Sequence, residues 1–339
     1  MQETPDSPEA LATIPVLTLS DLDPKIKSIP NEIIQKEPAT ILYHDLFTSE
    51  ILYLDLSLDM KALPGEYLPY MRLFMRSLLE MGTEKETFVE LIQRIGRETG
   101  GIHQSLFASQ KADRNGFVAN LMIRSKVMAN KTPALLAILE DILLIPDLSN
   151  KTRFYQILLE EKSSIEAGII PSGHRVVNNR LKSQYSPSAW VTEKMSGIDY
   201  LFFIRNLISN FEDEWENITT ILQKMRSILV SQDNVLLNIT IDQPNLDMIK
   251  PPLLNFVTSL PKNNTSYPQW NINSTIQNEG WTIPSQVNFV GKGGNLYDLG
   301  YEDHGSMSVI TQYLRSTWLW EKIRVQGGAY GGLVSFDRY

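Results

Sequence analysis

The chain has no cysteine and, among 339 residues, only four histidines. Without cysteine there is no disulfide framework, no thiol nucleophile and no zinc site with thiolate ligands. The sequence also lacks H-E-x-x-H and the inverted H-x-x-E-H, the spacings that place two histidine ligands of a catalytic zinc on one helix. We therefore expect this polypeptide to bind no metal by itself.

Positive charge and long apolar stretches are also scarce. The 31 Lys and Arg residues against 39 Asp and Glu residues give a net charge of -8. A nucleic acid or an anionic membrane surface requires a basic face, so neither is an expected partner, whereas a basic peptide has the complementary sign. No apolar run approaches the ~18 to 20 residues that cross a bilayer. The acidic, proline-rich start is unlike a signal or transit peptide.

The composition of the chain, 42% apolar and 9% aromatic, is typical of a globular protein. Its length predicts two domains. Changes in composition and pattern place the boundaries. The predicted division is a proline-rich linker at 1–38, an α+β domain at 39–243, a helix and turn-rich connector at 244–280, and the start of a second α+β domain at 281–339.

Hydrophobic periodicity predicts the elements of the first domain. Strands are expected at 41–47 and 51–59, forming a hairpin, and at 101–109, 117–127 and 234–242. Helices are expected at 64–81, 83–96, 132–145, 150–167, 174–182, 186–195, 199–210 and 212–229, the second of them opened by a capping box from Thr83 to Glu86. Strands at the start, middle and end with helices between them predict an α+β fold, with helices layered on one face of a mostly antiparallel sheet.

The second domain is predicted to begin with a strand at 286–294 that ends in glycine, and a helix at 305–323 follows. The helix runs into a pattern that we call the Arg/Tyr motif, Arg324-Val-Gln-Gly-Gly-Ala-Tyr-Gly-Gly332, and a strand at 333–336 comes last. Glycine has no Cβ and tolerates positive φ, so two glycine pairs around Tyr330 let another chain approach the backbone closely.

Arg324 and Tyr330 are the strongest candidates for chemistry. The five donors of a guanidinium and the phenolic hydroxyl can together hold a peptide carbonyl, or the oxyanion that develops when the carbonyl is attacked. The alternative is structural: Arg324 paired with a nearby carboxylate and Tyr330 packed on the glycine turn. Spacing alone leaves both interpretations open.

The same order of helix, Arg-x-x-Gly-Gly-x-aromatic and strand occurs earlier, as Arg97-Glu-Thr-Gly100-Gly101-Ile-His103. Identical spacing in both halves indicates a duplicated domain whose second copy is cut short.

Other candidates have simpler explanations. His44, His103, His174 and His304 are interpreted as packed, turn or capping residues, because none is spaced as a metal ligand. Ser172-Gly-His174 lacks a nucleophile elbow, and Gly291-Lys-Gly-Gly294 lacks the Gly-Lys-Ser/Thr ending of a phosphate loop. Glu160, Glu161 and Glu166 are interpreted as a solvated helix face.

The segment from Thr317 to Gly332 closely resembles the C-terminal Arg/Tyr motif of pitrilysin-type inverted zincins, in the branch that contains presequence protease and falcilysin. Similar segments of that branch include Ser77-Leu-Leu-Glu-Met-Gly-Thr83, Gly96-Arg-Glu-Thr-Gly-Gly-Ile102 and Pro284-Ser-Gln-Val-Asn-Phe-Val-Gly-Lys-Gly-Gly-Asn-Leu-Tyr297. In this family, four related α+β domains form two halves that close around an unfolded peptide, and the first domain carries zinc and H-x-x-E-H.

The resemblance implies that this chain is the C-terminal half, covering the third domain and the start of the fourth. Arg324 and Tyr330 would then bind the substrate carbonyl, and the backbone at Gly327, Gly328, Ala329 and Gly331 would contact the peptide. Zinc would be bound by an N-terminal half, in the same polypeptide or a separate one, and not by this chain. The implied location is the mitochondrial matrix or chloroplast stroma in a eukaryote and the cytoplasm in a bacterium.

The function implied by the resemblance is the substrate-binding half of a zinc metalloendopeptidase that degrades short unstructured peptides, such as cleaved targeting presequences. The alternative is a catalytically inert peptide-binding or assembly module of the same fold. On the first hypothesis the isolated chain is expected to be inactive.

Overall fold

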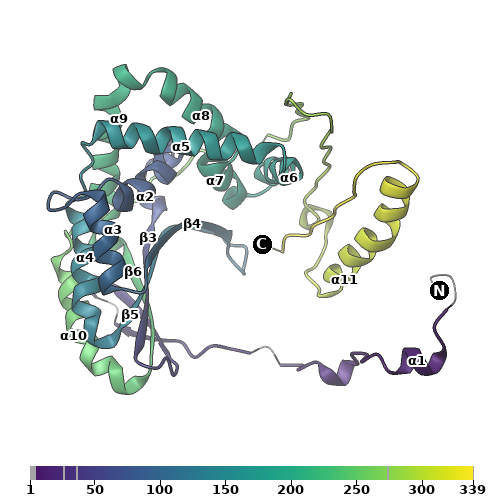
Figure 1. The fold of residues 1–339 in the computed structure, drawn as a ribbon, viewed down its shortest axis with the longest axis horizontal. Coiled ribbons are helices and arrows are strands. Elements are labelled where there is room, and N and C mark those ends of the chain that lie inside the picture. Colours follow the sequence, from purple (N-terminus) through teal and green to yellow (C-terminus); the bar gives the residue numbers. More distant parts are fainter. Residues whose placement is uncertain (1–4, 26, 36, 273–274, 339) are drawn as a thin grey trace.

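A six-stranded sheet forms the centre of the computed structural model, which describes residues 5–25, 27–35, 37–272 and 275–338 (Figure 1). The strands lie in the order β1-β2-β6-β3-β5-β4. Their bounds are β1 Glu32–Gln35, β2 Thr40–Asp45, β3 Ile51–Asp59, β4 Ile102–Gln110, β5 Phe117–Met128 and β6 Val235–Ile241. The pair β2–β6 is parallel and all other neighbours are antiparallel. The predicted α+β class with a mostly antiparallel sheet is confirmed.

The predicted hairpin between the strands at 41–47 and 51–59 is wrong. Strand β6 lies between β2 and β3, with Asn238 opposite Leu42 on one side and opposite Asp55 on the other. Consecutive strands are neighbours only about two-thirds of the time, and here the last strand of the domain fills the central position. Its alternate residues from Val235 to Ile241 are buried, because successive side chains point to opposite faces and one face of the sheet is packed on the core.

The helices predicted between residues 64 and 229 are present, but the first two start later than expected, and a 3-10 helix at Gly65–Tyr70 precedes α2. Their bounds are α2 Met71–Glu80, α3 Phe88–Glu98, α4 Thr132–Leu144, α5 Lys151–Ile169, α6 Gly173–Ser183, α7 Pro187–Ser196, α8 Ile198–Ser209 and α9 Phe211–Leu229. A short helix α1, Pro8–Ala12, lies in the N-terminal segment, and α10, Gln243–Ser259, follows β6. None of the described helices is both long enough and apolar enough to cross a bilayer.

The start of α3 differs from the prediction. Thr87 and Glu90 form the capping box, in which the Thr87 backbone N–H donates to the Glu90 carboxylate at 2.8 Å. The stretch from Thr83 to Glu86 forms a turn instead, closed by the Thr83 N–H on the Glu86 carbonyl at 2.9 Å. Two Thr-x-x-Glu patterns follow each other here, at 83–86 and 87–90, and only the second is followed directly by the amphipathic run.

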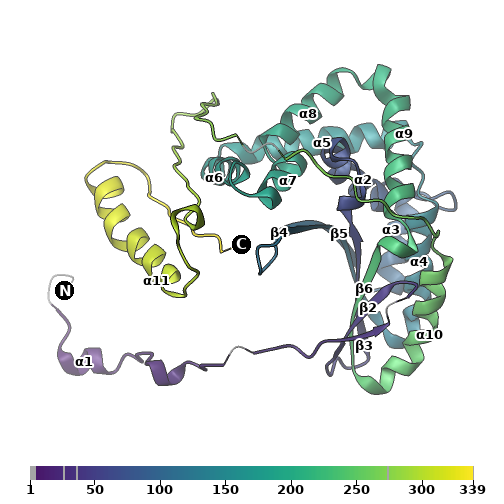
Figure 2. The same cartoon turned by 180° about the vertical axis from the view of Figure 1, so that it is seen from behind.

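One face of the sheet carries the core. Along β3, Leu52, Leu54, Leu56 and Leu58 are fully buried, whereas Tyr53 on the opposite face is 44% exposed. Helices α3, α4 and α10 lie on the same side of the sheet in both views (Figures 1 and 2). Buried side chains of α10, such as Leu253 and Phe256, belong to this core, so the packed unit continues past residue 243.

Glu161 corrects one expectation about the surface of α5. Its side chain is only 5% exposed, and its two oxygens lie 2.6 Å from Arg72 Nε and 3.0 Å from Arg76 Nη1. The carboxylate therefore joins α5 to α2 and is not part of a solvated face. Glu160 and Glu166 are more exposed, at 51% and 34%.

The predicted helix at 305–323 is present as α11, Ser306–Tyr313, continued by two π-helical stretches, Leu314–Trp318 and Trp320–Val325. The predicted strands at 286–294 and 333–336 are wrong, since neither segment pairs with another strand within the described ranges. A strand requires a neighbour for its backbone N–H and C=O groups. In the only sheet found in the described residues, β4 is an edge strand, and neither segment pairs with it.

Candidate functional site

The first glycine pair of the Arg/Tyr motif ends the C-terminal helix. Gly328 has φ +67°, and its N–H donates to the Arg324 carbonyl at 3.0 Å, while the Ala329 N–H donates to the Ile323 carbonyl at 3.1 Å. A Cβ on Gly327 would lie 2.7 Å from the Ile323 oxygen. Both positions therefore require glycine for the helix to stop within one turn of Arg324.

The second glycine pair turns the chain back onto the helix. A Cβ on Gly332 would lie 3.1 Å from Leu319 Cβ and 3.3 Å from Ile323 Cβ, so the returning backbone packs directly on these side chains. Tyr330 lies between the two glycine pairs and is 96% exposed. The motif is thus a tight loop that presents a phenol to solvent.

Arg324 lies on the last turn of the same helix. Its guanidinium carbon is 4.2 Å from the centroid of the Trp320 ring, a cation–π contact that leaves the guanidinium donors available. In the described part of the chain, Arg324 has no ion pair and shares no hydrogen bond with Tyr330. Among the described residues, Arg324 therefore lacks the carboxylate partner of the structural alternative, and the 96% exposure of Tyr330 does not fit packing on the glycines.

The earlier copy of the motif shares one backbone feature with the later copy. Gly101 has φ +107°, as Gly328 has φ +67°, so the second glycine of each pair is left-handed. The His103 ring lies against Gly101, 3.2 Å from the position of an added Cβ, and the stem of Lys126 crosses Gly100. This copy continues as β4, which pairs with β5. The residue before the glycine pair differs, since Thr99 is extended at φ -131° and ψ 171° whereas Gln326 is helical at φ -82° and ψ -38°. The duplication therefore stays a prediction.

The segment predicted as a strand at 286–294 packs along helix α6 instead. An added Cβ on Gly173 would lie 2.3 Å from the Phe289 ring, and one on Gly291 would lie 2.3 Å from Val177. The Tyr185 hydroxyl donates to the Gly293 carbonyl at 3.2 Å. Helix α6 therefore holds the chain that leads to the Arg/Tyr motif (Figure 1).

An ion cluster around Arg180 fixes the start of this segment. Its guanidinium is bidentate on Glu279, at 2.7 and 2.8 Å, and also lies 3.0 Å from Asp199 and 3.3 Å from Glu193. Burial raises the pKa of Glu193, whose side chain is 2% exposed. The hydrogen bonds from Arg180 lower the pKa of Glu279. The cluster therefore joins α6, α7 and the connector.

Replacement of Gly173 by alanine is expected to displace this docked segment. The new Cβ overlaps the Phe289 ring, and overpacking of this kind costs about 1 to 3 kcal/mol. The measurement is amide hydrogen exchange in residues 286–294, which should become faster in Gly173→Ala. Gly168→Ala is the matched control, because a Cβ there meets nothing within 4 Å. Unchanged exchange in both variants would contradict the assigned packing.

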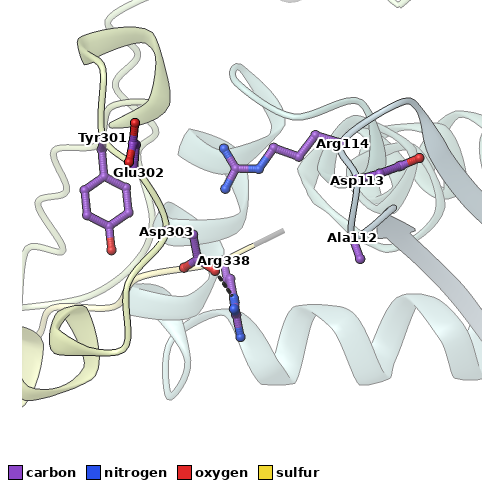
Figure 3. Close-up of a pocket in the computed structure, with 7 residues that line it drawn as sticks. All are labelled: Ala112, Asp113, Arg114, Tyr301, Glu302, Asp303 and Arg338. Atoms are coloured by element: carbon purple, nitrogen blue, oxygen red, sulfur yellow. Dashed lines mark hydrogen bonds and ion pairs between the residues drawn. The ribbon is translucent and has the colours of Figure 1, made fainter.

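A second contact, which sequence reasoning missed, joins the sheet to the C-terminal segment. Arg114, in the turn between β4 and β5 at φ 59°, lies 3.0 Å from the centroid of the Tyr297 ring. Figure 3 shows Arg114 directed from that turn toward the ion pair of Asp303 with Arg338. Arg114, Asp303 and Arg338 line an open recess of about 470 Å³. Its charges are of both signs, and nothing in the local sequence links the two segments.

The histidines do not come together. His44 contacts the Pro30 carbonyl and Asn238 through its two ring nitrogens, and His304 contacts Ser306 at the start of α11. Across the described ranges, no group of three or more His, Asp or Glu side chains is arranged to hold a metal ion.

Two sequence models of known families match this chain. Residues 1–207, more than half of the chain, match the model of the family described as peptidase M16 (subfamily C) associated. The chain belongs to this peptidase family. Residues 278–339, which include α11 and the Arg/Tyr motif, match the PreP C-terminal domain. The resemblance inferred from the motif is confirmed.

Relatives of this peptidase M16-associated chain are longer proteins. It is 36% identical over 339 residues to presequence protease 1, chloroplastic/mitochondrial, of Arabidopsis thaliana, covering 100% of this chain and 31% of that protein. It is 31% identical over 339 residues to protein HypA of Clostridium perfringens, covering 99% and 34%. The chain thus spans about a third of the length of these curated relatives.

A solved structure with a similar outline is the peptidase M16 inactive domain from Pseudomonas fluorescens. The TM-score is 0.46 at 14% identity, over 70% of this chain and 52% of that one.

Proposed function

We propose that this chain is the substrate-binding C-terminal half of a zinc metalloendopeptidase that degrades short unstructured peptides, such as cleaved targeting presequences. The observation that carries the proposal is the exposed loop of the Arg/Tyr motif. It holds Tyr330 at 96% exposure between glycine pairs, with Arg324 on the adjoining turn and not paired with a carboxylate in the described residues. Membership of the peptidase M16 (subfamily C) associated family and 36% identity to a presequence protease support it.

The roles of the loop follow from its donors. The Arg324 guanidinium and the Tyr330 hydroxyl would donate to the carbonyl oxygen of the scissile peptide bond, and their hydrogen bonds would strengthen as that oxygen becomes an oxyanion. Backbone at Gly327, Gly328, Ala329 and Gly331 carries no bulky side chain, so a peptide could approach within hydrogen-bond distance. The pair would therefore orient the substrate and stabilise the tetrahedral state.

Zinc, when bound by a partner segment, would activate the attacking water. The described residues of this chain offer no cluster to hold it, so no part of that step is assigned to them. The zinc-bearing N-terminal half is a required partner on this proposal, joined through residues 1–38 or supplied as a separate polypeptide.

The proposed domain division follows the family arrangement. The sheet and its helices, α10 included, would be the third domain, the residues from the end of α10 to 280 the connector, and residues 281–339 the start of the fourth domain. The Arabidopsis relative is named as chloroplastic and mitochondrial. We propose the corresponding organelle interior for a eukaryotic protein and the cytoplasm for a bacterial one.

The test is a cleavage assay with an unfolded basic peptide, using this chain alone, a zinc-bearing N-terminal half alone, and the two together. We expect cleavage only by the combination, with loss of activity on zinc chelation. Cleavage by this chain alone would contradict the proposal. If no zinc-bearing half is encoded upstream of Met1 or in a neighbouring gene, the chain is an inert peptide-binding module.

A further inference from the structure

An aromatic recess lies where the connector passes the end of β3 and the start of β5, outside the Arg/Tyr motif. We call it the aromatic recess; it has a volume of about 460 Å³ and is lined chiefly by Asp59, Lys61, Phe117, Tyr267 and Trp270. This volume is within the ~300 to 1,000 Å³ typical of sites for small ligands.

Two rings form a fixed floor. The Trp270 indole N–H donates to the Leu63 carbonyl at 2.8 Å, and the indole packs on Gly65, where an added Cβ would lie 3.3 Å away. The Phe117 ring is 5.8 Å from Trp270 at 37°, and both rings pack against the core. Because hydrogen bonding and packing hold these rings, the recess exists before any ligand binds.

The lining of the recess carries one carboxylate, Asp59, and one ammonium, Lys61, and the carboxylate of Asp233 lies near Tyr267. Burial raises the pKa of Tyr267, and the charges of Asp59 and Asp233 raise it further, so the phenol is close to both carboxylates. In the part of the chain that the structure describes, neither Asp59 nor Asp233 has an ion pair. Aromatic faces beside unpaired carboxylates attract cations.

Lys61 already shows this attraction. Its ammonium lies 5.8 Å from the centroid of the Phe117 ring. Lysine has a long flexible stem, so the ammonium can leave when another cation enters. The Lys61 ammonium would thus compete with a bound cation for the Phe117 ring.

We propose that the aromatic recess binds the guanidinium of an arginine side chain in a peptide, between the rings of Phe117, Tyr267 and Trp270 and beside Asp59. A guanidinium is planar, stacks on aromatic faces and donates in a fork that suits a carboxylate. Binding itself is a property of this chain alone. Its use in holding substrate rests on the proposed function.

The test is a titration of the chain with Nα-acetylarginine methylamide, followed through the indole N–H signal of Trp270 in ¹⁵N NMR spectra. Nα-acetylglutamate methylamide and Nα-acetylnorleucine methylamide are the charge and size controls. We expect saturable binding of the arginine probe alone. Asp59→Asn should weaken it about threefold or more, since Asn still accepts the Lys61 N–H at 2.9 Å but has no charge.

Lys61→Gln is expected to change the affinity for the arginine probe in the opposite direction. Removal of the internal cation should strengthen arginine binding by about twofold to fivefold. Tyr267→Ala should weaken binding, whereas Tyr155→Ala, an exposed tyrosine on α5, should leave it unchanged. Equal affinity in wild type, Asp59→Asn and Lys61→Gln, or a preference for the glutamate probe, would overturn the proposal.

A second arm separates this site from the catalytic role. In the assembled peptidase, Asp59→Asn should raise KM for a peptide with one arginine and leave KM unchanged for the same peptide with norleucine. If assembly gives no cleavage at all, the proposed function fails while the titration still decides the recess. If the titration shows no binding while cleavage proceeds, the recess proposal alone fails.

Discussion

Tyr330→Phe and Arg324→Ala are each expected to lower kcat/KM of the assembled peptidase by about 10²-fold or more, the usual cost of losing one oxyanion donor. Tyr330→Phe removes a single hydroxyl from a ring that is 96% exposed, so folding should be unaffected. Because the interaction is made mainly in the transition state, kcat should fall more than KM rises. Arg324→Lys should recover only part of the loss, since an ammonium lacks the planar fork.

The same helix offers matched controls. Tyr313→Phe removes a hydroxyl from a ring that is 63% exposed, and Lys322→Ala removes an exposed cation two residues before Arg324. Neither should change kcat/KM by more than about twofold, the scale of surface substitutions. Near-normal activity in both Tyr330→Phe and Arg324→Ala would remove the assigned role, as would equal losses in the control variants.

Arg180→Ala is expected to cause the largest loss of stability. Its guanidinium compensates Glu193, which is almost fully buried, together with Asp199 and Glu279. Removal of one partner from a buried ion cluster costs about 3 to 5 kcal/mol, because an uncompensated charge is left behind. Glu279 also loses its two hydrogen bonds to Arg180 on α6, so the segment at 286–294 should separate from that helix. Thermal unfolding and hydrogen exchange would measure the two effects.

The loss should depend on pH in a defined direction. The raised pKa of Glu193 means that its ionisation opposes folding, so its stabilising effect is present below the unfolded pKa and is lost as pH rises through the folded pKa. The lowered pKa of Glu279 contributes stability that is lost as pH falls. Without Arg180 both carboxylates lose their cation, so the difference from wild type should shrink as pH falls, first through the raised pKa of Glu193 and then through the lowered pKa of Glu279.

Arg205→Ala is the control for this variant. Arg205 pairs with Glu166 on the surface, with exposed fractions of 47% and 34%, and exposed pairs contribute about 0 to 1 kcal/mol. An Arg180→Ala variant that is no less stable than Arg205→Ala, or whose deficit is independent of pH, would contradict the assigned cluster.

The parts of this fold that were predictable depend on local pattern. The ends of helices α4 to α9 agree with the predicted ranges to within about two residues, because local apolar content and helix-starting or helix-ending residues mark them in the sequence. The glycine pairs also predicted a local feature, since Gly101 and Gly328 both have positive φ at a helix end. These features could be predicted because they depend only on residues nearby in the sequence.

The errors share a different cause. The hairpin failed because β6, nearly 200 residues after β2, fills the space between β2 and β3, and short strand patterns do not specify their partners. The pattern at 286–294 is apolar and polar in alternation, yet its partner is helix α6 and not a strand. Arg180 likewise joins Glu193 to Glu279, and that link is tertiary. For the candidate site, spacing identified Arg324 and Tyr330, whereas the exposure of the loop required the structure.

The most direct test of the account uses a phosphinic peptide, which mimics the tetrahedral state of amide hydrolysis. Its inhibition constant and kcat/KM would be measured for the assembled peptidase in wild type, Arg324→Lys, Arg324→Ala and Tyr330→Phe. If the pair binds the oxyanion, the inhibition constant should rise in proportion to the loss of kcat/KM, whereas the Kd of an uncleaved peptide stays nearly constant. An inhibition constant that is unchanged while kcat/KM falls would show that Arg324 and Tyr330 do not contact the tetrahedral oxygen, and would contradict the account.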